Sequence, residues 1–206
     1  GFNENTPPHK ILEMLLFYSI PRKDTNEIAH DLINRFGSVA GVIDAPLEEL
    51  VKIKGVSLHT ASLIKLLVPI IRCYVNEKNE KKISYSKIDD VCDFLVQQYI
   101  GYNKEVFSVL SFSGSGRMLG FDALGHGNVS EVNISVREVV ETVLKRNAVC
   151  VIIAHNHPGG LALPSNEDIA VTYNIKSALS HINIRLLDHI VISDDDYVSM
   201  AQSRLY

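Results

Sequence analysis

Tryptophan is absent from this sequence of 206 residues, and cysteine occurs only three times. Cys73, Cys92 and Cys150 are an odd number at wide spacing, and each lies in an apolar pattern. A disulfide framework would need more of them, so we expect a protein of the reducing cytoplasm. No Cys-x-x-Cys pair occurs, which argues against a zinc site made of thiolates.

Long apolar runs are missing as well. The most apolar stretch, residues 63–75, is interrupted by Lys65 and Arg72. A helix that crosses a bilayer needs roughly 18 predominantly apolar residues. No secretory signal is visible. We therefore expect no membrane partner.

A large excess of one charge is the third absence. Residues 1–82 hold 11 Lys and Arg against 10 Asp and Glu, whereas residues 83–206 hold 9 against 14. Neither part has the strongly basic character of a dedicated nucleic-acid-binding protein. The acidic second part should repel phosphate unless a metal ion intervenes.

The composition is that of a folded chain, with 46% hydrophobic and 21% charged residues, and it excludes wholesale disorder. Apolar residues at helical spacing predict an all-α beginning. The expected helices cover residues 10–18, 24 or 25 to 36 with Gly37 after the end, 47–53, and 58–74. Residues 76–82 are polar and mostly charged, so we place a domain boundary at 82/83; a solvated helix end within one domain is the alternative.

The pattern then changes to alternating strands and helices, which predicts an α/β domain over residues 83–206. Short apolar runs on either side of a Ser-Gly-Ser-Gly turn predict an antiparallel hairpin. A continuous apolar run predicts a central strand that is buried on both faces. The expected elements are helices over 88–98, 135–146 and 168–182, and strands over 106–112, 118–124, 149–154 and 184–193.

Two histidines follow the buried strand. His155 and His157, at i and i+2, lie on the same side of an extended chain, where both imidazoles could bind one cation. Asp168 opens the next helix and could return a carboxylate to them, leaving a fourth position for water, as in catalytic zinc sites. A His-x-His pair alone is a weak signal, and Ser165 with Asp168 also forms a variant capping box. Both roles can hold together.

The spacing of these residues resembles a known motif. His-x-His-Pro, six further residues and Ser-x-x-Asp form the JAMM (MPN+) metalloprotease motif, matched by His155, His157, Ser165 and Asp168. Residues 85–206 resemble the RadC family still more closely, since they also carry its Pro-Ser-x-x-Asp, Arg-Glu-Val-Val and Ile-Arg-Leu-Leu-Asp-His segments. The resemblance implies a JAMM/cytidine-deaminase-like α/β domain with a mixed sheet and one Zn²⁺ per chain, bound by His155, His157 and Asp168.

The resemblance also implies catalytic roles. In JAMM enzymes a glutamate from an earlier strand acts as general acid and base, and Glu105 matches it in position. Ser165 would donate a hydrogen bond to the oxyanion, as the equivalent serine does in those enzymes. A solvated carboxylate at the start of a strand is the alternative for Glu105. Two other glutamates compete for the role: Glu138, which fits a capping box with Ser135, and Glu131, which lies in a polar stretch.

Asp188 and His189 form a second polar pair. Neighbours on a strand face opposite ways, so both could bind one ion only with a bulge. Two interpretations remain open: Asp188 orients a ligand histidine from behind, or the two residues are a satisfied polar pair at the strand.

The first part of the chain resembles a helix-hairpin-helix domain, the usual N-terminal domain of RadC proteins. In DNA-binding members the hairpin reads h-x-G-h-G, and backbone N–H groups at a helix start meet a phosphate. Here Gly55 is present but Ser57 replaces the second glycine. Weak DNA binding and a protein-docking or structural module remain alternatives.

Taken together, these features predict a RadC-family zinc hydrolase of metallopeptidase or isopeptidase type, with a peptide or protein substrate that the sequence does not name. The alternative is a DNA-associated repair or recombination adaptor whose metal site is structural or vestigial. A third hypothesis, a metal-dependent nuclease, would need a basic groove, and the acidity of residues 83–206 speaks against one.

Overall fold

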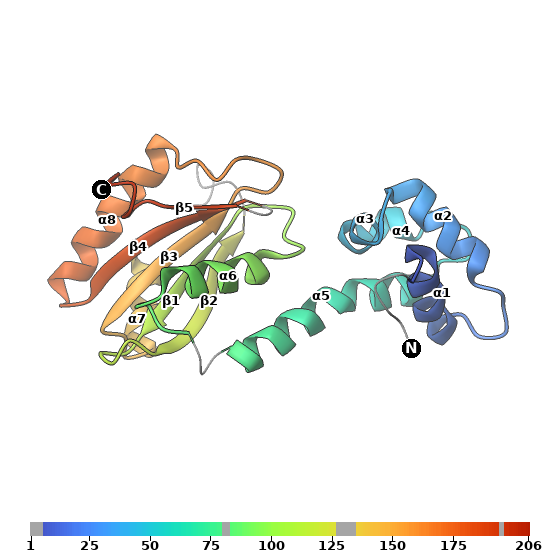
Figure 1. The fold of residues 1–206 in the computed structure, drawn as a ribbon, viewed down its shortest axis with the longest axis horizontal. Helices are drawn as coiled ribbons and strands as arrows, with labels where there is room; N and C mark the ends of the chain where they lie inside the picture. The colour runs from blue at the N-terminus through green and yellow to red at the C-terminus, as the bar shows by residue number, and fades with distance from the viewer. Residues whose placement is uncertain (1–5, 80–82, 127–134, 194–195) are drawn as a thin grey trace. The chain divides into compact units, whose positions relative to one another are not determined.

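A computed structural model describes residues 6–79, 83–126, 135–193 and 196–206 (Figure 1). The chain divides into two compact units, Gly1–Cys73 and Tyr74–Tyr206. The division falls inside helix α5 (Leu58–Asn79), which runs on into the polar segment 76–82. The first four residues of the predicted linker are therefore helical.

The first unit is all-α, as the apolar spacing predicts. Its helices are α1 (Pro8–Ser19), α2 (Asn26–Phe36), α3 (Val39–Asp44), α4 (Leu47–Leu50) and the first part of α5. Their apolar faces meet in one core that includes Leu12, Leu16, Ala29, Leu32, Leu50, Ala61 and Ile64. Helix α3 was not predicted, because it is only six residues long and contains a glycine that weakens the helical signal.

The turn before α5 explains two residues of the predicted hairpin. Gly55 has φ of +93°, and a Cβ there would lie 2.7 Å from Cδ1 of Ile28, so only glycine fits without rearrangement. Ser57 caps α5: its Oγ accepts a hydrogen bond from the N–H of Thr60 at 3.2 Å. The serine that replaces the second glycine thus satisfies one of the N–H groups that a phosphate would meet.

Helix α5 is long and apolar enough, over Leu58–Val75, to pass a length-and-composition test for a membrane span, which the sequence analysis did not anticipate. Its first half nevertheless packs in the helical core through Ala61 and Ile64. Lys65 donates hydrogen bonds to the carbonyls of Ile43 at 2.6 Å and Ala45 at 3.0 Å. These contacts place the first half of α5 in the helical core, whereas Ile70, Ile71 and Tyr74 in its second half are exposed.

The second unit is built on a five-stranded mixed sheet in the order β2-β1-β3-β4-β5. The strands are β1 (Val106–Phe112), β2 (Met118–His126), β3 (Cys150–Asn156), β4 (Arg185–Ile192) and β5 (Tyr197–Ser199). Only β3 and β4 are parallel, and all other pairs are antiparallel. The mixed α/β fold and the hairpin are confirmed. The short edge strand β5 was not predicted, since three residues carry too little periodicity.

Helices cover both faces of the sheet (Figure 1). Helix α6 (Ile88–Tyr99) packs on one face, against residues such as Leu110, Ile152 and Ile190. Helices α7 (Val136–Lys145) and α8 (Asn166–His181) pack on the other, against Phe107 and Ile153. The side chains of β3 alternate between the two cores, so His155 and Ile153 face the side of α7 and α8. This alternation places the histidines beside the start of α8.

The predicted capping box of α7 is wrong. Ser135 is the N-cap residue, but its side chain accepts no capping hydrogen bond, and Glu138 is exposed. The first turn is held instead by the backbone, where the N–H of Glu138 donates to the carbonyl of Ser135 at 2.8 Å.

Candidate metal centre

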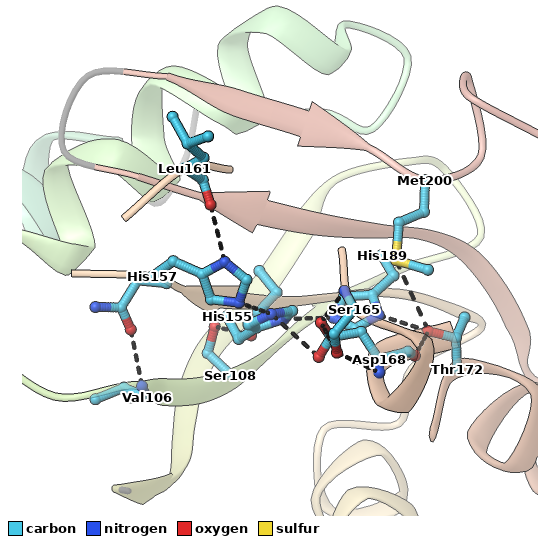
Figure 2. A network of polar contacts seen from close by, with 12 residues as sticks. Val106, Ser108, His155, His157, Leu161, Ser165, Asp168, Thr172, His189 and Met200 are labelled. Atoms are coloured by element: carbon cyan, nitrogen blue, oxygen red, sulfur yellow. Dashed lines mark hydrogen bonds and ion pairs between the residues drawn. The ribbon is translucent and has the colours of Figure 1, made fainter. Parts of the chain in front are cut away.

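The two histidines of the motif stand at the end of β3: His155 lies within this fully buried strand, and His157 directly follows its last residue. The ring of His155 has no exposed surface, and that of His157 is half-buried. Their Nε2 atoms are 3.0 Å apart (Figure 2). On its other side, His157 places Nδ1 2.9 Å from the carbonyl oxygen of Leu161. A carbonyl only accepts, so Nδ1 of His157 is the donor in this contact, and Nε2 is the nitrogen that faces His155.

Asp168 enters from the first turn of α8, where the predicted capping box is present in full. Its Oδ2 accepts hydrogen bonds from the N–H and the hydroxyl of Ser165, both at 2.7 Å, and Ser165 Oγ accepts from the N–H of Asp168 at 3.1 Å. The cap therefore fixes the carboxylate and directs its other oxygen, Oδ1, toward His155.

Three potential ligand atoms converge at this point. One ring nitrogen each from His155 and His157 and one carboxylate oxygen of Asp168 all lie within 4.8 Å of one another. Oδ1 of Asp168 is 3.3 Å from Nε2 of His155, yet this buried oxygen accepts no hydrogen bond. An unpaired buried carboxylate oxygen facing two imidazole nitrogens is costly unless a cation or proton compensates it. The donor set fits a divalent metal ion, and the metal-ligand geometry expected for these three residues is present.

The charge of Asp168 supports the same conclusion. Burial by itself would raise the pKa of this carboxyl group, but the polar contact with His155 and the hydrogen bonds from Ser165 lower it below its usual range. Asp168 is therefore a carboxylate at neutral pH, which is the form that binds a cation.

A residue that the sequence analysis did not assign to the site lies directly behind it. His189 on β4 is fully buried, and its Nε2 is 2.8 Å from Nδ1 of His155. Its Nδ1 is 2.6 Å from Oγ1 of Thr172 on α8. Burial, together with the nearby ring of His155, lowers the pKa of His189 well below its ordinary value, so this ring is neutral.

A β-bulge explains why His189 faces the site. The pairing of β3 with β4 shifts between Val151 and Ile152, which oppose Leu186 and Asp188. The extra residue on β4 reverses the alternation, so His189 faces the ligands and Asp188 the opposite side. Regular alternation from Leu186 would have placed them the other way round.

Asp188 does not orient a ligand histidine. Its carboxylate accepts hydrogen bonds from the hydroxyl of Ser199 and from the N–H groups of His189 at 2.7 Å and Ala201 at 3.0 Å. It therefore ties β4 to the end of the chain. Of the two interpretations left open by the sequence, the structure supports the satisfied polar pair, and the residue that contacts His155 is His189.

Glu105 immediately precedes β1 and is half-buried. The pairing of β1 with β3 ends at Phe107 and His155, so Glu105 stands just beyond the paired end of β1, at the same end of the sheet as His157. The buried amide of Asn156 holds this segment: its Oδ1 accepts from the N–H of Val106 at 2.8 Å, and its Nδ2 donates to the carbonyl of Lys104 at 3.3 Å. Both neighbours of Glu105 are thus fastened to the motif strand.

The roles of Glu105 and Ser165 in catalysis stay predictions. Glu105 is not one of the three clustered ligands, which suits a base better than a ligand. The hydroxyl proton of Ser165 is donated to Asp168, so an oxyanion could receive it only after rotation of the hydroxyl. Of the two competing glutamates, Glu138 is exposed on α7, and Glu131 lies outside the described residues.

Known proteins resemble this chain over most of its length. A family model described as a RadC-like JAB domain matches residues 85–205. A UPF0758 protein of Polaromonas sp. (strain JS666) is 34% identical over 193 residues, which cover 94% of this chain and 86% of the relative. A UPF0758 protein of Fusobacterium nucleatum is 34% identical over 212 residues, covering 100% and 90%, and one of Carboxydothermus hydrogenoformans is 32% identical over 204 residues, covering 98% and 90%.

Proposed function

The chain belongs to the family of proteins with a RadC-like JAB domain, and from this premise we propose that it is a zinc-dependent hydrolase of the metallopeptidase or isopeptidase type. One observation carries the proposal: the buried and unpaired Oδ1 of Asp168 faces two imidazole nitrogens at the end of a central strand. Three protein ligands from His and carboxylate side chains are typical of catalytic zinc sites, which keep a further position open.

When bound, zinc supplies Lewis-acid chemistry, which lowers the pKa of a water toward neutrality and polarises a carbonyl group. The protein's part is to present the ligands. His155 and His157 would offer one ring nitrogen each, and Asp168 offers a negative charge that its cap holds in place. None of these side chains needs to move far, because two are buried and the third is fixed through Leu161.

Glu105 is the proposed general base and acid. It stands at the same end of the sheet as His157, and Asn156 bonds to the residues on either side of it. Its carboxylate would accept a proton from the attacking water and return it to the leaving amine. Such a role calls for a side chain next to the metal ligands without being one of them.

Ser165 is the proposed hydrogen-bond donor to the oxyanion. It is exposed at the start of α8, and its hydroxyl is held by Asp168 in the structure described here. Rotation of the hydroxyl would exchange that bond for one to the developing charge. The same residue would then serve as helix cap, ligand support and donor.

The proposal also covers the class of substrate, the partners and the cellular compartment. A peptide or isopeptide bond is the expected target, and the reducing cytoplasm is the expected compartment, where the free thiols of Cys73, Cys92 and Cys150 would persist. No observation on the helical unit favours DNA binding over a docking or structural role, so a DNA-associated adaptor is kept only as the alternative that the test must distinguish.

The test begins with metal content. Full-length protein purified without added metal should carry about one zinc per chain by elemental analysis, as a single three-ligand site predicts. His157→Ala should lose the zinc, because it removes a ligand that is half-exposed and whose loss leaves the core intact. A wild-type protein without zinc, together with an unchanged stability of His157→Ala, would contradict the metal centre.

Activity is tested separately, with a mixed library of internally quenched peptides as the probe. Glu105→Gln should keep the zinc and lower hydrolysis by about 10²–10⁴-fold, the usual contribution of a general acid or base. Glu138→Gln is the matched control, since it removes an exposed carboxylate on α7 and should leave hydrolysis unchanged. Loss of zinc in Glu105→Gln would show instead that Glu105 is a ligand.

A further inference from the structure

A continuous chain of hydrogen bonds runs from His155 back to the helix that carries Asp168 (Figure 2). Nδ1 of His155 meets Nε2 of His189 at 2.8 Å, and Nδ1 of His189 meets Oγ1 of Thr172 at 2.6 Å. The same hydroxyl donates to the backbone carbonyl of Asp168, also at 2.6 Å. The three side chains are fully buried, so water does not compete for any of these bonds.

The direction of each bond follows from counting protons. A threonine hydroxyl has one proton, and each neutral imidazole has one on its two nitrogens. If Thr172 donates to the carbonyl of Asp168, it must accept from Nδ1–H of His189. Nε2 of His189 is then bare and accepts from Nδ1–H of His155, whose own Nε2 is left with a lone pair that faces the other ligands.

The opposite order belongs to the site without a cation, where a proton on Nε2 of His155 would face Nε2 of His157 at 3.0 Å and Oδ1 of Asp168 at 3.3 Å. There Thr172 donates to His189, His189 donates to His155, and Nε2 of His155 carries a proton that points toward His157 and Asp168. The carbonyl of Asp168 would lose the hydroxyl, although it lies within 2.6 Å. In this order His155 cannot bind a metal ion through Nε2. Both orders hold the same number of protons, so they differ only in tautomer.

We infer that Thr172 and His189 are positioning residues that favour the Nδ1–H tautomer of His155 when a cation occupies the site, with the backbone carbonyl of Asp168 as the fixed final acceptor. A carbonyl only accepts, so the far end of the chain has a defined polarity. That polarity passes through two side chains and leaves the Nε2 lone pair of His155 ready for a cation. The inference rests on the proposed metal centre and adds to it the residues that prepare one ligand.

The arrangement couples two ligands to one another. Thr172 lies one helical turn after Asp168, so the same turn of α8 supplies a carboxylate from its side chain and, through its backbone, the tautomer of His155. Groups behind a metal ligand commonly change metal affinity by about 10–100-fold when they are removed. Removal of the Thr172 hydroxyl, which does not contact the ion site, should therefore lower the affinity for the metal ion.

Thr172→Val tests the inference, because valine keeps the shape of threonine and removes only the hydroxyl. In the full-length, metal-free protein, the dissociation constant for Zn²⁺ is measured by competition with a chromophoric chelator. Thr172→Val should bind zinc about 10–100-fold more weakly, and Thr172→Ser should restore the affinity because it restores the hydroxyl. Thr142→Val, the same change on α7 away from the ligands, should bind like wild type.

A second measurement reads the tautomer directly. Nitrogen-15 NMR of the imidazoles in the zinc-loaded wild-type protein should show His189 protonated at Nδ1, the nitrogen that faces Thr172. Protonation of His189 at Nε2 in that protein, or wild-type zinc affinity in Thr172→Val, would overturn the inference. If the wild-type protein binds no zinc, the proposed function fails; if it binds zinc and Thr172→Val binds it equally well, only the inference fails.

Discussion

The interiors of the two units differ in the polar side chains that they bury. Among the residues that the structure describes, the helical unit buries two polar side chains, those of Thr25 and Thr60, and the rest of its core is apolar. The α/β unit buries two carboxylates and two imidazoles, from Asp168, Asp188, His155 and His189, besides several uncharged polar groups.

The difference shows which of the two units carries the free-energy cost of buried ionisable groups. Burying an ionisable group costs free energy unless it is paired, and an apolar core of the same size would be at least as stable. The helical unit buries no ionisable side chain among its described residues, whereas the α/β unit places three of its four, those of Asp168, His155 and His189, together at one end of β3. Buried titratable clusters of this kind are found preferentially at functional sites.

The largest expected effect comes from the ligand carboxylate. Asp168→Asn removes the negative charge but keeps an oxygen that can accept the capping hydrogen bonds of Ser165. We expect the zinc content measured by elemental analysis to fall to background. Glu167→Gln is the matched control, since Glu167 is an exposed carboxylate in the same first turn. Equal zinc in both variants would mean that Asp168 is only a helix cap.

A core truncation in the helical unit should have a large effect on that unit and little on the other. Leu32 has no exposed surface, so Leu32→Ala should lower the free energy of unfolding of the helical unit by about 2–5 kcal/mol. Zinc affinity should stay at the wild-type value. Chemical denaturation followed by circular dichroism, with a parallel zinc titration, measures both. A shift in zinc affinity would show that the interiors are not independent.

A smaller effect is expected from the amide that fastens Glu105. Asn156→Ala removes the bonds to Val106 and Lys104 but no metal ligand. We expect zinc to remain bound and hydrolysis of the quenched peptides to fall by about 10–100-fold, the range for groups that orient a reacting residue. Loss of zinc at the same time would assign Asn156 to the metal site instead.

The smallest effect concerns the cap of α5. Ser57→Gly removes the hydroxyl that accepts from Thr60 and should cost only a few tenths of a kcal/mol, because glycine is itself an acceptable N-cap. It also frees an N–H group for a phosphate. Gel-shift titrations against salt should show weaker DNA binding for wild type than for Ser57→Gly. Undetectable binding of both proteins at low salt removes DNA as a direct partner of the helical unit.

Much of the fold could be predicted because its elements are long and periodic. Helix α2 begins after Thr25 and ends before Gly37, although Thr25 makes no capping hydrogen bond and Asp24 instead accepts from the N–H of Asn26. Elements β1, β3 and α8 lie within a few residues of their expected bounds. The elements that the sequence did not predict are short, or they depend on contacts with other segments of the chain. Helix α3 and strand β5 carry too little periodicity, and Ser135 lacks the capping bond that its spacing predicts.

The candidate site also has a part that the sequence predicts and a part that it does not. The sequence by itself determined the three candidate ligands and the cap at Ser165, because each depends on spacing within one strand, one loop and one helix start. Only the tertiary structure decided that His189 and Thr172 stand behind His155 and that Asn156 holds the segment of Glu105. Those contacts join β3 to a bulged β4, to α8 and to β1, and a bulge or a strand register is set by packing between segments that local spacing does not record.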